Sequence, residues 1–288
     1  MNTHSHSFPL TRVLAAVIAA CALLIVPAAA QAVPTDPTNL AFTSTAPTGV
    51  KYGDKLAYQV VANSDNTVTP ITFAVDASSS TVCKLTGDIV SVLGAGTCKI
   101  NADQVEADPF LAGTATQSFS IAKASLSITA SSSSNFFGGS VPSIAAFYSG
   151  FVNGDSSSKL KTKPSCSTTA IAVSHPGVYP TSCSKAESPN YSFTYTGGTY
   201  TISLAPLVIV PSAKVHLGKL PKKYTLTGYG WQGWDDDVSN DLAGKPNCKV
   251  PSKAKRKPGI YKISCTAGKL KSLNYAITFA PGYLIVKK

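Results

Sequence analysis

A mostly β chain of three tandem units in an elongated array is the fold that the sequence predicts. Six of the seven cysteines form three pairs, separated by 15, 17 and 17 residues: Cys83 with Cys98, Cys166 with Cys183, and Cys248 with Cys265. The second and third pairs repeat at an interval of 82 residues (248 − 166 and 265 − 183). Matched pairs of this kind are typical of β units that each carry one disulfide in an oxidising compartment.

Apolar and polar residues alternate in many short segments, which is the pattern of a half-buried strand. The clearest examples are residues 191–195 (Tyr-Ser-Phe-Thr-Tyr) and 275–279 (Tyr-Ala-Ile-Thr-Phe). Pro-Gly, Gly-Gly and Asn-Gly pairs separate these segments, as expected for turns. No segment after residue 32 shows a convincing helical stripe. We therefore expect strands throughout the three units.

Residues 1–32 have the pattern of a secretory signal peptide. A polar start ends at Arg12, an apolar run follows, and Ala30-Gln31-Ala32 provides a small-x-small cleavage site before Val33. The run is too short to span a bilayer. An alternative is a lipoprotein anchored at Cys21, although the sequence stays apolar after this cysteine. No later segment predicts a transmembrane span, so we expect a secreted, extracellular or cell-surface protein.

The remaining chain divides into residues 33–123, 124–205 and 206–288. The last two segments correspond residue by residue. Gly150-Phe151 and Asp155 match Gly230-Trp231 and Asp235, and Asn190-Tyr191 matches Asn274-Tyr275. Pro176-Gly177-Val178-Tyr179 likewise matches Pro258-Gly259-Ile260-Tyr261.

These motifs resemble the tandem MBG repeats of bacterial secreted and surface proteins. In residues 124–205, Phe137-Gly138 replaces the Tyr-Gly turn of the family, and residues 206–288 are a degenerate copy. Residues 33–123 resemble a bacterial Ig-like domain through the segment before Cys83 and through Gly94-Ala95-Gly96-Thr97-Cys98. The resemblance implies β-sandwich, Ig-like or MBG-type folds. A short helical turn after Asp155 and Asp235 would instead make the last two units small α+β domains.

Catalysis finds no support in the motifs, and we expect no enzyme and no cofactor. His175 and His216 lie in different units, and no nucleophile elbow or zinc-protease motif is present. Gly154-Asp155-Ser156 belongs to the repeat, and residues 124–205 hold only Asp155 and Glu187 as acids. The cysteine spacing does not fit zinc, and Asp235-Asp236-Asp237 with Asp241 lacks a calcium-loop pattern. No metal is therefore expected.

Charge is concentrated in the last unit. Residues 206–288 carry 15 Lys and Arg against 4 Asp, a net charge of +11, whereas residues 33–123 have a net charge of −3. The densest run, Lys253, Lys255, Arg256 and Lys257, is expected in an exposed, flexible loop. A basic tip attracts anionic cell-wall polymer or acidic polysaccharide. An equally open interpretation is a charged loop that only keeps the protein soluble. Nucleic acid is not an expected partner, because no nucleic-acid fold signature is visible.

The function predicted from these observations is that of a non-enzymatic surface module that contacts an anionic polymer through its basic end. A second interpretation is an adhesin or protein-binding module that uses Trp231 and Trp234. These two tryptophans, three residues apart, could equally pack in a core. A third interpretation is a structural spacer.

Overall fold

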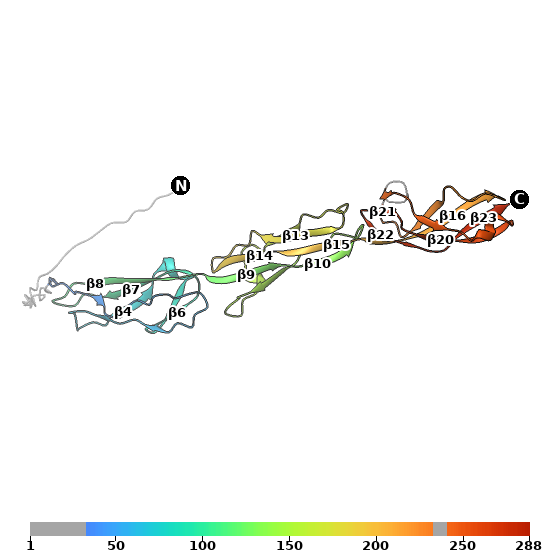
Figure 1. Cartoon of the computed structure of the whole chain (residues 1–288). Coiled ribbons are helices and arrows are strands. Elements are labelled where there is room, and N and C mark those ends of the chain that lie inside the picture. Colours follow the sequence, from blue (N-terminus) through green and yellow to red (C-terminus); the bar gives the residue numbers. More distant parts are fainter. Residues whose placement is uncertain (1–32, 233–240) are drawn as a thin grey trace, which may run out of the picture.

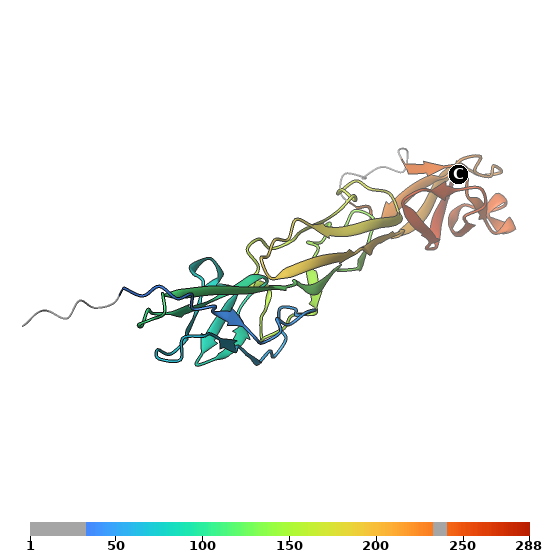
Figure 2. The ribbon, with the colours of Figure 1, turned by 90° about the vertical axis from the view of Figure 1, so that its left-hand side faces the viewer.

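A computed structural model describes residues 33–232 and 241–288 of the chain. The predicted signal peptide and the alternative anchor at Cys21 lie outside the described residues, as do Trp234 and Asp235–Asp237. The fold is mostly β, and its sheets form three successive groups. These are the first unit (33–123), the middle unit (124–204) and the last unit (from residue 205). Figure 1 and the perpendicular view in Figure 2 both show the units following one another in an extended array.

The first unit packs two antiparallel three-stranded sheets, β4-β7-β8 and β2-β6-β5, beside a short pair, β1 and β3. Its core contains alternate residues of the strands, including Val90 and Ile100, which are fully buried. The elements are β1 (Ala41–Phe42), β2 (Tyr58–Gln59), β3 (Ala62–Asn63), β4 (Thr72–Val75), η1 (Ala77–Ser79), β5 (Cys83–Thr86), β6 (Ile89–Val92), β7 (Gly96–Gln104) and β8 (Gly113–Ile121).

The middle unit contains a four-stranded sheet, β10-β15-β13-β12, and a three-stranded sheet, β11-β9-β14. Two pairings, β9 with β14 and β10 with β15, are parallel, which the sequence pattern did not indicate. The elements are β9 (Ala124–Ala130), β10 (Ser133–Phe136), β11 (Ala146–Ser149), η2 (Ser157–Lys159), β12 (Ser165–Thr168), β13 (Gly177–Ser184), β14 (Tyr191–Thr196) and β15 (Gly198–Ser203). The helical turn expected after Asp155 is the single 3-10 turn η2, so the unit stays a β domain.

The last unit is built on one long strand, β16, whose first half pairs with β22 and whose second half pairs with β23, both in parallel. Leu207 and Ile209 of β16 are fully buried, whereas Val208 between them is exposed. The elements are β16 (Ala205–His216), β17 (Thr225–Tyr229), β18 (Leu242–Ala243), β19 (Asn247–Lys249), η3 (Ser252–Lys255), β20 (Gly259–Thr266), β21 (Lys271–Ser272), β22 (Tyr275–Phe279) and β23 (Gly282–Lys287).

The three cysteine pairs are joined as disulfides, one in each unit. Cys83 and Cys98 join β5 to β7 and so connect the two facing sheets of the first unit. The other two bonds join residues directly opposite each other on neighbouring antiparallel strands, Cys166 with Cys183 and Cys248 with Cys265. Such cross-links stabilise a unit by reducing the conformational freedom of its unfolded chain.

Within residues 33–232 and 241–288, none of the helical segments has the length and hydropathy of a membrane span.

Candidate functional site

The predicted basic cluster lies on an ordered turn rather than in a flexible loop. Lys253 and Lys255 belong to the 3-10 turn η3, and Arg256 and Lys257 follow it directly. All four side chains are exposed, whereas Ala254 between them is fully buried against Ile263, Leu284 and Val286. Burial of this alanine anchors the segment, which was expected to be a flexible loop, to the core of the last unit.

The η3 turn lies at the distal end of the last unit, the end farthest along the array. Strand β20 begins at Gly259, just after the turn, and Gly259 pairs with Val286 near the end of β23. His216, at the end of β16, pairs with Lys287 at the same end. The basic turn therefore shares this end with the last lysines of the chain (Figure 1).

The cations of the last unit are not neutralised by neighbouring acids in the part of it that the structure describes. Both ion pairs found among the described residues lie elsewhere, Lys99 with Asp76 (3.2 Å) in the first unit and Lys161 with Glu187 (3.1 Å) in the middle unit. Hydrogen bonds from Ser78, Asn101 and Lys99 hold the pKa of Asp76 well below its usual range. Among the described residues of this unit, the cations therefore lack ion-pair partners.

A second basic feature of the last unit brings together lysines that are far apart in sequence. Lys222 and Lys223, just before β17, face Lys245, just before β19, across a cavity of about 300 Å³. Its other lining residues are Tyr224, Leu226, Gly244 and Pro246. Sequence reasoning missed this pocket, because only the overall density of lysine pointed to it. The cavity thus combines the side chains of three lysines with a tyrosine and a leucine.

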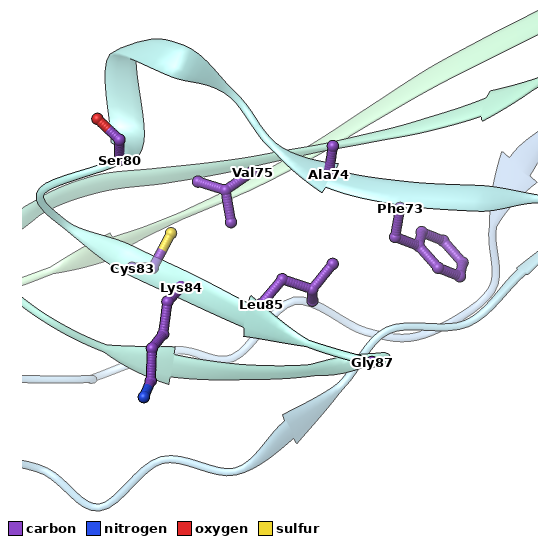
Figure 3. Close-up of a pocket in the computed structure, with 8 residues that line it drawn as sticks. All are labelled: Phe73, Ala74, Val75, Ser80, Cys83, Lys84, Leu85 and Gly87. Atoms are coloured by element: carbon purple, nitrogen blue, oxygen red, sulfur yellow. The ribbon is translucent and has the colours of Figure 1, made fainter.

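A groove in the first unit has a different character. It lies between β4 and β5, and Figure 3 shows Phe73 and Val75 directed toward Leu85, whereas Lys84 extends away. No acid or histidine lines it; the remaining lining residues are Ala74, Ser80, Cys83 and Gly87. This groove is an opening between the edges of two sheets and offers no group for acid–base chemistry.

Trp231, predicted as a ligand contact, lies at a joint between units, and the structure also gives partners to the histidines and the acid that the sequence did not support as a site. Trp231 packs edge to face against Tyr275 with ring centroids 5.0 Å apart, so this tryptophan is half-buried and not a free platform. His175 pairs through Nδ1 with Asn274 Oδ1 (2.7 Å) across the joint between the middle and last units. Asp241 accepts hydrogen bonds from Ser272 and Asn274. Nδ1 of His216 contacts the carbonyl of Lys288 (3.1 Å).

At the joint between the first and middle units, the turn at Tyr52-Gly53 of the first unit packs against the middle unit. Tyr52 is 7% exposed, and its ring meets Tyr191 edge to face at 5.5 Å. The hydroxyls of Tyr52 and Tyr191 both donate to Asp155 Oδ2 at 2.8 Å. Burial raises the pKa of Tyr191 to about 12 and also raises the pKa of Tyr52. A Cβ on Gly53 would lie 2.6 Å from Val152, so only glycine permits this approach.

The joint between the middle and last units has the same arrangement. Phe137 is 7% exposed and meets Tyr275 edge to face at 5.7 Å. A Cβ on Gly138 would lie 2.3 Å from Gln232, as one on Gly53 would meet Val152. The amide of Gln232 donates to the Tyr275 hydroxyl (3.0 Å), just as the amide of Val152 donates to that of Tyr191 (3.1 Å).

Sequence reasoning recognised the Gly-aromatic and Asn-Tyr motifs as shared by two units of the chain but assigned them no role. In the structure they form the proximal end of a unit, the surface that receives the turn of the unit before it. Asn190 Oδ1, for example, accepts from the amide of Ala95 in the first unit (2.9 Å). The sequence signal that could have revealed this joint is Tyr52-Gly53. It is a Tyr-Gly pair like that of the MBG family, but it lies in the first unit, which we had compared with an Ig-like domain.

The fold, the three disulfides and these joints define a class of protein, an extracellular chain of linked β units. Residues 126–201 match the family model of the MBG domain (YGX type). This match confirms the resemblance for the middle unit. None of the curated proteins matches the chain.

Two solved multidomain structures are similar to this chain at low identity. One is Drosophila N-cadherin EC1-4, with 10% identity over 86% of this chain and 75% of that chain and a TM-score of 0.22. The other is Sidekick-1 immunoglobulin domains 1–5, with 10% identity over 86% of this chain and 58% of that chain and a TM-score of 0.29. Similarity at this level says nothing about what this chain binds.

Proposed function

We propose that the protein is a non-enzymatic, secreted or cell-surface array of β units that contacts an anionic polymer through its last unit. In this proposal residues 1–32 are removed, the first unit is an Ig-like domain, and the last unit is a divergent MBG-type copy. The joints act as spacers that hold the units in line, which presents the basic end away from the first unit. The ligand is a cell-wall polymer or an acidic polysaccharide.

One observation carries the proposal. Four exposed cations, Lys253, Lys255, Arg256 and Lys257, project from a turn that a buried alanine fixes to the core, without an ion-pair partner among the described residues. Binding an anion there orders less of the protein backbone than binding to a flexible loop would, so the entropy cost is smaller. The pocket of Lys222, Lys223 and Lys245 adds a second anionic subsite in the same unit.

The test compares two variants of the mature chain that remove the same charge. The first replaces Lys253, Lys255, Arg256 and Lys257 with Ser. The control replaces four exposed lysines of the other units with Ser, namely Lys55, Lys84, Lys159 and Lys163. Binding to purified teichoic acid and to polygalacturonate is measured from low salt to about 0.15 M, where the screening length is near 8 Å.

We expect the first variant to lose most of its affinity and the control to keep it, with wild-type binding falling steeply as salt rises. Both variants should unfold near the wild-type temperature, because exposed charges contribute little to folding. Equal losses in the two variants would mean that net charge alone draws the polymer. Salt-insensitive binding of a protein partner would favour the adhesin alternative instead.

A further inference from the structure

The turn that joins the units occurs a third time, at the distal end of the last unit. There Leu217 and Gly218 occupy the places that Tyr52-Gly53 and Phe137-Gly138 occupy in the first and middle units. Each turn has a glycine at positive φ, with values of 99°, 78° and 86° in chain order. Each is also closed by a backbone hydrogen bond to the end of the last strand of its unit or to the residue after it. The amide of Tyr52 donates to the carbonyl of Ala122 (2.8 Å), that of Phe137 to Ser203 (2.8 Å) and that of Leu217 to Lys287 (2.9 Å).

The third turn differs from the other two in what covers it. Tyr52 and Phe137 are each 7% exposed because the next unit packs on them, whereas Leu217 is 43% exposed. A Cβ on Gly53 or Gly138 would collide with the following unit, but a Cβ on Gly218 would meet nothing within 4 Å. The last unit therefore ends in the same kind of turn that packs against the next unit in the other two joints, but none of the described residues packs on this third turn.

We propose that the Leu217-Gly218 turn is a docking surface for the proximal end of a further MBG-type β unit, one outside residues 33–288. The two occupied joints define the chemistry of that partner. It presents a Gly-aromatic pair and an Asn-Tyr pair beside an apolar surface, as Gly150-Phe151 and Asn190-Tyr191 do in the middle unit.

Charge and polar contacts favour the same partner. Exposed Lys219 and Lys288 flank the turn, so an acid at the position of Asp155 in the incoming unit would be attracted rather than repelled. Lys123, which follows the last strand of the first unit as Lys288 follows that of the last unit, donates to the carbonyl of Ser188 across its joint (2.9 Å). Lys288 can make the equivalent bond to a docked unit.

A second copy of this chain does not provide the partner surface. The proximal ends of the middle and last units are already covered by the turns before them. The first unit contains neither an Asn-Tyr pair nor a glycine followed by an aromatic residue. The partner is therefore a unit outside residues 33–288 that carries these motifs at an uncovered proximal end.

The experiment appends a second copy of residues 124–205, with an uncovered proximal end, directly after Lys288 of the mature chain. Ala124 begins two residues after Ala122 in the native joint, and the fusion keeps this spacing after Lys287. The tether raises the effective concentration of the probe. Docking is read from the NMR amide signals of residues 217–219, compared with those of the unextended chain. A parallel fusion appends residues 205–288 instead and provides the docking probe if the appended copy of residues 124–205 does not fold.

We expect large shifts at residues 217–219 in the fusion, and Leu217→Asp should reduce the docked fraction at least tenfold. Leu111→Asp is the matched control, since Leu111 is also 43% exposed but lies in the first unit, and it should leave docking unchanged. Unshifted amides beside a folded appended unit would overturn the proposal, and so would docking that survives Leu217→Asp. Self-association of the unextended chain through Leu217 would also overturn it, because a second copy would then be the partner.

Discussion

The close approach of Gly53 to Val152 provides a sharp test of the joint between the first and middle units. Gly53→Ala adds one methyl group at a position where the nearest atom, Val152 Cγ2, would lie 2.6 Å away. Gly49→Ala is a matched control in the same unit. Gly49 also has a positive φ (71°, against 99° at Gly53), but a Cβ there would meet nothing within 4 Å.

The two substitutions share one cost and differ in another. An alanine held in the left-handed region loses about 1–2 kcal/mol relative to glycine, and this applies to both variants. Only Gly53→Ala also overpacks the joint, at a further cost of about 1–3 kcal/mol. The free energy of unfolding should therefore fall by about 1–3 kcal/mol more in Gly53→Ala than in Gly49→Ala.

The assay is urea denaturation followed by far-UV circular dichroism, with midpoints and slopes compared between the variants. A double-mutant cycle with Val152→Gly completes the test, because removing the valine side chain makes room for the new methyl group. The cycle should give a favourable coupling of about 1–3 kcal/mol between Gly53→Ala and Val152→Gly. Equal losses in the two alanine variants, together with a coupling below about 0.5 kcal/mol, would refute the close approach.

Three further outcomes are expected from single features. Burial raises the pKa of Tyr191 to about 12 in the folded state, whereas the unfolded side chain titrates near 10. The stability contributed by the neutral, buried Tyr191 is therefore complete below about pH 10 and is lost as the pH rises to about 12. Urea midpoints should fall more steeply over that interval for the wild type than for Tyr191→Phe. Replacing Cys166 and Cys183 together with Ser should cost about 3 kcal/mol, as loop entropy predicts for a loop of this length, and a thermal midpoint unchanged by the replacement would count against a native disulfide. Ala254→Leu should cost about 1–3 kcal/mol by overpacking the core under η3, and calorimetry showing wild-type stability would mean that the basic turn is not anchored there.

Much of the last unit follows from local sequence pattern. Residues 207–210 (Leu-Val-Ile-Val) are all apolar, and the strand geometry of β16 places Leu207 and Ile209 in the core because side chains of a strand point to opposite faces in turn. Alternation placed residues 275–279 in a strand, now β22. The density of lysine likewise marks the last unit as basic from residue types alone.

The pattern did not reveal which strands pair in parallel or which side chains meet between units. Strands β9 and β14 pair along their lengths although they begin at Ala124 and Tyr191, and no local period encodes such a partner. The anchoring of η3 was missed for a related reason. A single alanine in a basic run carries no periodic signal, yet its burial makes the turn part of the core.

Sequence alone determined the mostly β class, the basic character of the last unit and the MBG resemblance of the middle unit, because each depends on residue type and spacing along the chain. The joints were decided by tertiary structure. Tyr52 and Asp155 are 103 positions apart in the chain, and their hydrogen bond exists only because two folded units bring a turn and the loop between β11 and η2 together. The exposure of Leu217 is likewise visible only in the fold, since its two equivalents are covered by the units that follow them and Leu217 is not.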